Sequence, residues 1–245
     1  MLFSVLRQSI FILSNTLKKF KDNNVNALSR DGFISLKNFF PSNYCDDFLK
    51  KYYIDEVAEE NYISKYKTIT KSELEYIINT LKQKGIIDII KEYLGKKIIC
   101  YDNSILFLGN KTSEKESWMP HHDNKENRLK LYIFLVSSDN KNQPLDYLVG
   151  SHKKIKTWKN SFECRLNNYT NNMNVQTIYN NKGDLLIFDT HGFHSNKKFS
   201  KNFRATIVLT FESIGFFKRI NYFLPSGKRE IERLKKTSED NFIYL

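Results

Sequence analysis

From residue 98 onward the sequence alternates between short apolar, β-branched segments and polar turns, and this pattern restricts the chain to an antiparallel β fold. The turns are rich in Asn, Gly, Lys and Ser. Strands are predicted at 98–108, 129–136, 145–149, 174–179, 185–189, 204–212 and 215–223. Many short strands separated by turns predict an antiparallel β-barrel or jelly roll.

The residues before this region predict helices instead. Capping residues and apolar spacing predict helices at 42–60, 72–83 and 86–93, and we expect Ser72, followed by Glu75, to begin the second of them. One short strand is expected at 33–36. Helices followed by strands predict a mostly β fold with a helical layer packed on it. Because no linker interrupts the chain, we expect one domain over 1–245 with its jelly-roll core at 96–223.

The first 30 residues predict an N-terminal amphipathic helix. An apolar stripe recurs at steps of three and four: Leu2, Leu6, Ile10, Leu13, Leu17 and Phe20. Arg7 and Gln8 interrupt the apolar run, so we expect no transmembrane segment, and there is no cleavage site of the signal-peptide type. We expect this helix to pack on the domain. Weak contact with a membrane surface through residues 1–20 is the alternative.

The formal net charge of +12, from 39 Lys and Arg against 27 Asp and Glu, could serve a nucleic-acid partner. Lys and Glu alternate over most of the chain, however, and abundant Lys, Asn and Ile are typical of an AT-rich genome. We therefore expect a solvated surface and no nucleic-acid partner. Cys45, Cys100 and Cys164 are far apart, which argues against disulfides and a Cys-rich zinc site and favours a cytoplasmic location.

All five histidines lie between residues 121 and 194. In an extended segment residues i and i+2 point to the same side, so His121 and Asp123 project together while His122 points away. His194 follows the predicted strand at 185–189 and would supply a third ligand. Two histidines and one carboxylate on one face of an octahedral ion leave three positions open, which suits non-haem Fe(II) with O₂ and a bidentate co-substrate.

Arg204 follows His194 by ten residues and begins the apolar strand at 204–212. A buried arginine is costly unless it is paired, and its guanidinium matches a carboxylate. Thr206 lies on the same strand face and can add a hydroxyl donor. An arginine one strand away from the metal stands where the distal carboxylate of 2-oxoglutarate needs to be bound.

Taken together, these motifs resemble the phytanoyl-CoA dioxygenase (PhyH-like) family of Fe(II)/2-oxoglutarate-dependent oxygenases, over residues 31–211. The segments that carry the resemblance are DGFISLKNFFPSNYCDDFLKK, HHD, PLDYLVGSHK and GDLLIFDTHGFHSN, in that order. Arg204 falls where the family places its co-substrate arginine. The family's Asn-Gly-Pro-Leu turn has Gln143 in place of glycine here, which affects the turn and not the metal site.

The resemblance implies a double-stranded β-helix, the cupin-like jelly roll, with N-terminal helices packed on it. It implies Fe(II), 2-oxoglutarate and O₂ as cofactors. The implied iron ligands are His121, Asp123 and His194, and the implied 2-oxoglutarate residues are Arg204 and, as weaker candidates, Thr206, Tyr132 and Asn196. Because Asp123 is present, where related halogenases have a small residue, the implied reaction hydroxylates a C–H bond of a small-molecule metabolite and releases succinate and CO₂.

Several alternatives stay open at this point. His122 and His191 compete for the two histidine positions, and with Trp118 they are candidates to line the substrate pocket. His152 is expected to be a structural residue at a turn. The substrate could be anionic or carrier-linked, and outcomes other than hydroxylation use the same three ligands.

Two other functions compete with the oxygenase. One is a non-catalytic jelly-roll binding module. The other is a nucleic-acid oxidative dealkylase, but such enzymes carry a second arginine six residues after the first, and position 210 here is Thr210.

Overall fold

The computed structural model describes residues 9–15, 20–52, 64–108, 120–123, 127–138, 144–154, 174–196, 204–213 and 243–244. The strands of a larger sheet are β1 (Phe33–Leu36), β2 (Ser64–Thr68), β3 (Ile98–Leu108), β4 (Arg128–Phe134), β7 (Leu185–Asp189), β9 (Arg204–Ser213) and β10 (Ile243–Tyr244). Those of a smaller sheet are β5 (Leu145–Leu148), β6 (Val175–Ile178) and β8 (His194–Asn196).

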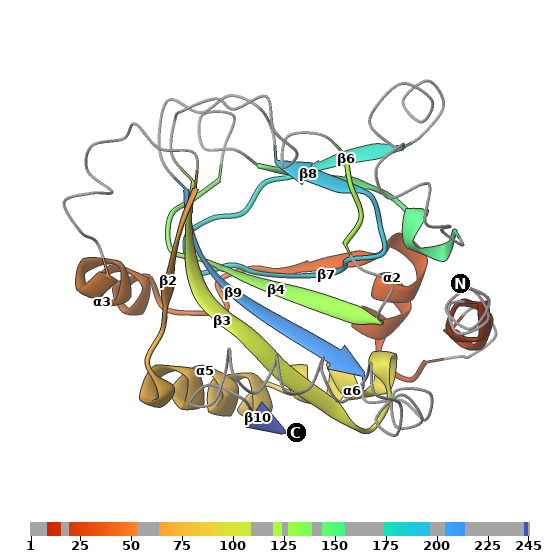
Figure 1. Cartoon of the computed structure of the whole chain (residues 1–245), viewed down its shortest axis with the longest axis horizontal. Coiled ribbons are helices and arrows are strands. Elements are labelled where there is room, and N and C mark those ends of the chain that lie inside the picture. The colour runs from red at the N-terminus through yellow and green to blue at the C-terminus, as the bar shows by residue number, and fades with distance from the viewer. Residues whose placement is uncertain are drawn as a thin grey trace, which may run out of the picture.

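These two sheets face each other, and every pairing among the described strands is antiparallel (Figure 1). The larger sheet has the order β1-β7-β4-β9-β3-β10, with β2 also paired to β3, and the smaller has the order β6-β5-β8. The expected jelly-roll fold is therefore confirmed. The strands predicted between 98 and 212 are present within two residues at each end, and the segment 215–223 lies outside the described residues.

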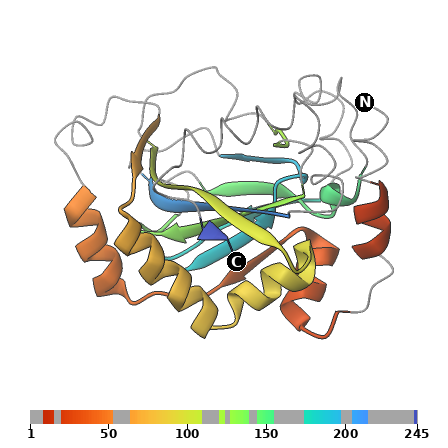
Figure 2. The ribbon, with the colours of Figure 1, turned by 60° about the horizontal axis from the view of Figure 1, so that its bottom comes forward.

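Helices cover the outer face of the larger sheet (Figure 2). They are α2 (Asn23–Asp31), α3 (Ser42–Tyr52), α5 (Lys71–Gln83) and α6 (Ile86–Leu94). The stripe predicted for α5 is buried, as Leu74, Ile77, Ile78 and Leu81 show. These side chains pack with outward-facing strand residues such as Ile207 into one apolar core, whose burial stabilises the layered arrangement.

Side chains alternate between the two faces of β9, and this alternation separates core from site. Ala205, Ile207 and Leu209 belong to the core beneath the helices. Val208 belongs instead to a second apolar cluster on the inner face, and Arg204 shares its face because strand residues two apart point the same way. The members of this inner cluster are Leu106, Tyr132, Phe134, Leu145, Tyr147, Ile178, Leu186, Phe188 and Val208.

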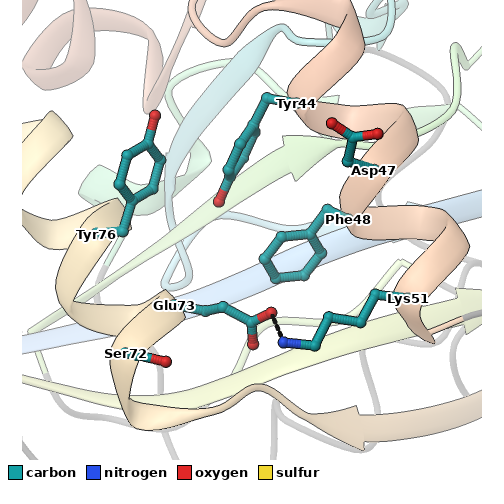
Figure 3. A pocket seen from close by; sticks show the side chains of 7 residues that line it. All are labelled: Tyr44, Asp47, Phe48, Lys51, Ser72, Glu73 and Tyr76. Carbon is teal, nitrogen blue, oxygen red and sulfur yellow. Dashed lines mark hydrogen bonds and ion pairs between the residues drawn. The ribbon is translucent and has the colours of Figure 1, made fainter.

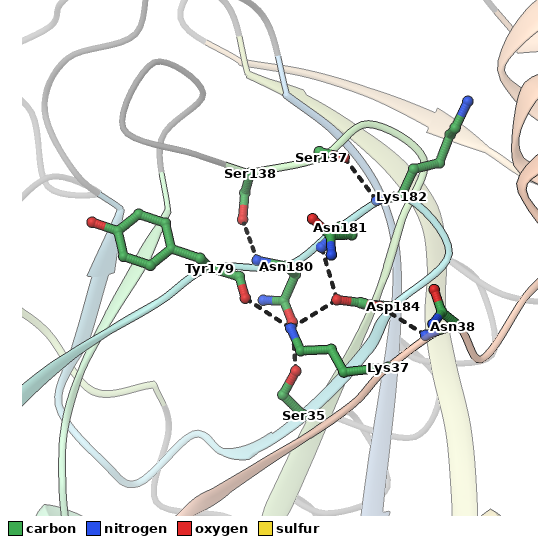
Figure 4. A network of polar contacts seen from close by, with 10 residues as sticks. All are labelled: Ser35, Lys37, Asn38, Ser137, Ser138, Tyr179, Asn180, Asn181, Lys182 and Asp184. Atoms are coloured by element: carbon green, nitrogen blue, oxygen red, sulfur yellow. Dashed lines mark hydrogen bonds and ion pairs between the residues drawn. The ribbon is translucent and has the colours of Figure 1, made fainter.

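Asp184 fixes the turn that leads from β6 into β7 (Figure 4). Its buried carboxylate accepts hydrogen bonds from the N–H groups of Asn38, at 2.8 Å, and Asn181, at 2.7 Å, and pairs with Nζ of Lys37 at 2.8 Å. The N–H of Phe134 donates to the Asp184 carbonyl at 3.1 Å. These contacts tie the start of β7 to the ends of β1 and β4 and so set the position of the strand that leads to His194.

A groove lies between α3 and α5 (Figure 3). It is lined by Tyr44, Asp47, Phe48, Lys51, Ser72, Glu73 and Tyr76. The ion pair between Lys51 and Glu73, at 2.7 Å, joins the two helices. Since the groove belongs to the helical layer, it is separate from the inner face of the sheets.

The helix start predicted at Ser72 is wrong. Thr70 is the N-cap of α5: its Oγ1 accepts from the N–H of Glu73 at 3.4 Å, and Oε2 of Glu73 accepts from the N–H of Thr70 at 3.0 Å. Both Ser72-Glu75 and Thr70-Glu73 have capping-box spacing, so the sequence pattern alone did not separate them. Glu73 also bonds to Lys51 and Tyr52 of α3, and this tertiary contact favours the earlier start.

The N-terminal region differs from the single helix expected over 1–30. Helical residues 9–15 are followed by a separate helix, α2, which begins after its N-cap Asp22. Oδ1 of Asp22 accepts from the N–H of Asn24 at 2.6 Å, which satisfies a backbone donor of the new helix. No helix in the described part of the chain is long and apolar enough to cross a membrane.

The face that residues 9–15 present to the domain also differs from the prediction. Ile10 and Leu13 of the expected buried stripe are 47% and 58% exposed. Phe11 makes the contact instead, with its ring centroid 5.7 Å from that of Tyr93 in edge-on geometry. An aromatic ring that fits against Tyr93 therefore decides the packing of this helix.

The larger sheet extends beyond the core expected at 96–223. β1 pairs with β7, β2 pairs with β3, and β10 pairs with β3 near its start. β2 and β10 were not predicted from the sequence. The helix predicted over 42–60 ends within the described residues at Tyr52, and its remaining part lies outside them.

Candidate metal centre

His121, Asp123 and His194 lie together in the structure. His121 and His194 form an isolated antiparallel bridge: the N–H of His121 donates to the His194 carbonyl at 3.0 Å, and the reverse bond measures 2.8 Å. The N–H of Asp123 donates to the carbonyl of Thr190 at 2.9 Å. Backbone hydrogen bonds thus hold the HxD segment against the segment that carries the second histidine.

One potential ligand atom from each residue lies within 4.8 Å of the others. Oδ1 of Asp123 is 3.9 Å from Nε2 of His121 and 3.9 Å from Nε2 of His194. Among the described residues, this is the one group of three His, Cys, Asp or Glu side chains with such an arrangement. Two imidazoles and one carboxylate suit a divalent transition metal and leave further coordination positions open.

His194 is oriented to bind through Nε2. Its Nδ1 lies 2.9 Å from the carbonyl oxygen of Gly192, and because a carbonyl only accepts, Nδ1 carries the proton. The Nε2 lone pair is then free to face Asp123. Burial, together with the nearby His121, lowers the pKa of His194 to about 3. The ring is therefore neutral at physiological pH, which is the form that binds metal ions.

The metal-free protein is expected to lose stability as the pH falls below 6.5, the ordinary pKa of histidine. Because the pKa of His194 is about 3 in the folded state, the unfolded state binds more protons between these values. The free energy of unfolding should fall by at most roughly 5 kcal/mol over this window. Urea denaturation of wild type and His194→Gln from about pH 4 to 8 measures the effect. If the difference in unfolding free energy between wild type and His194→Gln does not change with pH, His194 does not have a lowered pKa in the folded state.

The two carboxylate oxygens of Asp123 have different partners. Oδ1 faces the two imidazoles, whereas Oδ2 lies 2.6 Å from Nζ of Lys130. Burial alone would raise the pKa of Asp123, but Lys130 and His194 outweigh it and hold the pKa below the usual carboxyl range. The carboxylate is therefore ionised at physiological pH.

A buried polar cluster fixes the turn between β7 and His194. Oδ2 of Asp189 accepts from the hydroxyl of Tyr93 at 2.6 Å, and Oδ1 accepts from the N–H of His191 at 2.8 Å. The hydroxyl of Tyr147 donates to the Asp189 carbonyl at 2.9 Å. Satisfied buried polar groups of this kind favour one backbone conformation, so the cluster positions His194 indirectly.

Gly192→Ala is expected to destabilise the protein by about 3 kcal/mol or more and to weaken metal binding. An added Cβ would lie 1.8 Å from Oη and 2.2 Å from Cζ of Tyr147, and this fully buried ring has no space to move away. Urea denaturation measures the loss. The double variant Gly192→Ala/Tyr147→Leu should lose less than the sum of the two single variants, and strictly additive losses would rule out the clash.

Arg204 is fully buried at the start of β9 and lies among three other residues predicted for the co-substrate site. Its Nη2 donates to Oδ1 of Asn196 at 2.9 Å, and its guanidinium carbon lies 5.7 Å from the ring centre of Tyr132. Thr206 is buried on the same strand face, and its hydroxyl has no hydrogen-bond partner within the described residues. Burial lowers the pKa of Arg204 to about 10, so it stays charged at neutral pH.

Arg204 and the candidate ligands are connected through two strands. On β8, His194 belongs to the ligand group and Asn196 contacts Arg204. On β4, Lys130 contacts the ligand carboxylate and Tyr132 lies beside Arg204. Residues i and i+2 of a strand share a face about 7 Å apart. The guanidinium is therefore about one such step from the candidate metal centre.

The other histidines lie outside the ligand group. The ring of His122 packs edge-on against Phe193 with centroids 5.4 Å apart. His191 has Nδ1 3.8 Å from Oδ1 of the Asp189 carboxylate. His152 donates from Nε2 to a carbonyl of α2 at 3.0 Å. Trp118, a candidate for the substrate pocket, lies outside the described residues.

The sequence analysis missed two features of the site. Lys130 sits two residues before Tyr132 in a strand, so it shares the inner face. A charged residue at an inward position was an available signal. The second feature is the cluster around Asp189, which takes Tyr93 from α6 and Tyr147 from β5. No local pattern connects residues so distant in sequence.

No protein-family model matches the sequence, and no curated protein matches it. Solved structures do match it. The non-heme alpha ketoglutarate dependent epimerase SnoN from nogalamycin biosynthesis has a TM-score of 0.54 at 14% identity, over 78% of this chain and 82% of that one. HygX from Streptomyces hygroscopicus, with nickel and 2-oxoglutarate bound, has a TM-score of 0.55 at 10% identity, over 81% of this chain and 89% of that one.

A third similar structure is EctD from S. alaskensis with 2-oxoglutarate and 5-hydroxyectoine. Its TM-score is 0.52 at 16% identity, over 81% of this chain and 80% of that one. At such low identities these likenesses establish the jelly-roll fold with its helical layer. A shared fold does not establish a shared reaction, which depends on the site residues of this chain.

Proposed function

We propose that this protein is an Fe(II)- and 2-oxoglutarate-dependent oxygenase that hydroxylates a C–H bond of a small-molecule metabolite. One observation carries the proposal: a His-Asp-His group lies about one strand step from the buried, charged Arg204. Solved structures of the same fold include proteins described as alpha ketoglutarate dependent or solved with 2-oxoglutarate, which supports it. On its sequence motifs we assign the chain to the PhyH-like branch.

The residues present fit an iron site. His121 and His194 offer ring nitrogens, and Asp123 offers Oδ1, from positions within 4.8 Å of one another. The protonated Nδ1 of His194 fixes the tautomer that leaves Nε2 available. When bound, iron with 2-oxoglutarate and O₂ supplies the oxidation: one oxygen atom enters the substrate C–H bond, and the other enters succinate as CO₂ leaves.

The residues around Arg204 fit the co-substrate. A guanidinium forms two parallel hydrogen bonds to a carboxylate, which would be the C5 carboxylate of 2-oxoglutarate. Asn196 holds the guanidinium from β8, and Tyr132 lies against it from β4. The buried hydroxyl of Thr206 offers a further donor. These residues would bind and orient the co-substrate.

Hydroxylation is proposed because Asp123 occupies the position of the carboxylate ligand. The same fold also serves an enzyme described as an epimerase, so the product has to be identified directly. For the substrate we propose an anionic or carrier-linked small molecule, in keeping with the net charge of +12, bound near His122, His191 and Trp118. We propose a cytoplasmic location, and weak membrane-surface contact through residues 1–20 stays a prediction.

Two measurements test the function. Anaerobic addition of Fe(II) and 2-oxoglutarate should give a weak visible charge-transfer band. Succinate release in air should then be screened against a metabolite library with DNA included. Succinate formation coupled to one metabolite supports the proposal. Binding of 2-oxoglutarate without any succinate would favour the binding module, and absence of both signals would reject the oxygenase.

A further inference from the structure

Lys130 lies at the candidate metal centre, and its signal in the sequence is a charged residue at an inward position of a strand. It sits on β4, on the face that also carries Tyr132, opposite Thr210 of β9 and Phe188 of β7. Its Nζ is 2.6 Å from Oδ2 of Asp123. A metal ligand and an ammonium group are therefore in direct contact on the inner face.

This ion pair differs from the lysine pairs on the surface. The side chains of Lys130 and Asp123 are 20% and 18% exposed. Lys182 and Asp46 form a comparable pair, at 2.7 Å, but their side chains are 31% and 58% exposed. An exposed pair is screened by water and has little effect on its surroundings. A largely buried ammonium interacts much more strongly with any charge placed beside it.

The contact with Lys130 also gives the two carboxylate oxygens of Asp123 different surroundings. Oδ1 of Asp123 is 3.9 Å from Nε2 of each histidine, while Oδ2 is held by Lys130. A carboxylate with one oxygen held in this way offers the other oxygen alone to a metal. Coordination positions are then kept for the co-substrate and O₂.

We propose that Lys130 is a positioning residue that restricts Asp123 to binding the metal through Oδ1. Its fixed positive charge weakens the binding of a divalent cation and strengthens the binding of an anionic co-substrate next to it. This inference rests on the proposed function. If the charge is removed, the affinity for the divalent cation should rise and the affinity for the anionic co-substrate should fall. Simple damage to the site would lower both affinities.

The test uses Lys130→Met, which removes the charge at similar length, and Lys130→Gln, a smaller polar variant that also removes the charge. Co(II) is titrated anaerobically into each metal-free protein, followed by 2-oxoglutarate into the Co(II)-loaded protein. In both variants Co(II) should bind about tenfold more tightly and 2-oxoglutarate about tenfold more weakly. Lys130→Arg should restore both affinities to within about threefold, because it keeps the charge. Circular dichroism verifies folding.

Lys182→Met is the matched control, because it removes a lysine that pairs with the exposed Asp46, and it should change neither affinity. The proposal is overturned if both affinities fall together, or if neither changes, in the folded Lys130 variants. Asp123→Ala separates this outcome from failure of the proposed function. Wild-type protein that binds Co(II) no better than Asp123→Ala would overturn both.

Discussion

Asp123→Ala is expected to weaken binding of Fe(II) or Co(II) and to reduce succinate formation by roughly 1,000-fold. Loss of an outer partner of a metal ligand typically costs about 10–100-fold in affinity or activity, and loss of the ligand itself should cost more. Asp123 is the anionic member of the His-Asp-His group. Its removal also leaves Lys130, 2.6 Å away in the present structure, without its carboxylate beside the incoming cation.

Metal affinity and succinate release should be measured on the same preparation, so that activity lost through failed metal loading is identified. Asp46→Ala is a suitable control, because Asp46 also pairs with a lysine but is 58% exposed in a different part of the chain. It should behave like wild type. Asp123→Ala with full metal affinity would exclude Asp123 as a ligand.

Arg204→Met is expected to weaken 2-oxoglutarate binding by about 100-fold or more while metal affinity stays within about threefold. Losing a buried, charge-assisted contact to a carboxylate costs about 2–5 kcal/mol. Arg204 is fully buried, and methionine is an apolar side chain of similar length, so this buried position should tolerate the substitution. Titration of 2-oxoglutarate into the Co(II)-loaded protein measures the effect.

Arg204→Lys should recover only part of the affinity, because an ammonium cannot form the two parallel hydrogen bonds of a guanidinium. Arg30→Met is the matched control, since Arg30 pairs with Asp31 but is 72% exposed. It should leave the titration unchanged. Equal 2-oxoglutarate affinity in Arg204→Met and wild type would remove Arg204 from the co-substrate site.

The strands were predictable from sequence because their signals are local. Segments such as 98–108 and 185–189 contain β-branched and apolar residues between turn residues, and both strands form at those positions. The proximity of His121 and Asp123 was also predictable, since HxD spacing places two candidate ligands on one side of an extended segment. The single-domain organisation and the roles of these residues stay predictions.

The errors have a common cause in tertiary contacts. Ser72 and Thr70 both have a Glu three residues later, and the contacts of Glu73 with α3 favour Thr70. In the N-terminal segment, the fit of Phe11 against Tyr93 outweighs the stripe that contains Ile10. Local patterns indicate which residues can serve as an N-cap or be buried, and tertiary packing determines which of these candidates do so.

The jelly-roll class, the candidate ligands and the position of Arg204 could be predicted from the sequence alone, because strand periodicity and motif spacing are properties of neighbouring residues. The side chains around them could be identified only in the folded chain. The tertiary structure brings Lys130 of β4 to Oδ2 of Asp123, and it places Asn196 and Tyr132 beside the arginine. The register between antiparallel strands sets these contacts, and register depends on the packing of both faces of the sheet. An inward lysine, which the sequence presents as one more charged residue, is therefore a neighbour of the candidate metal centre.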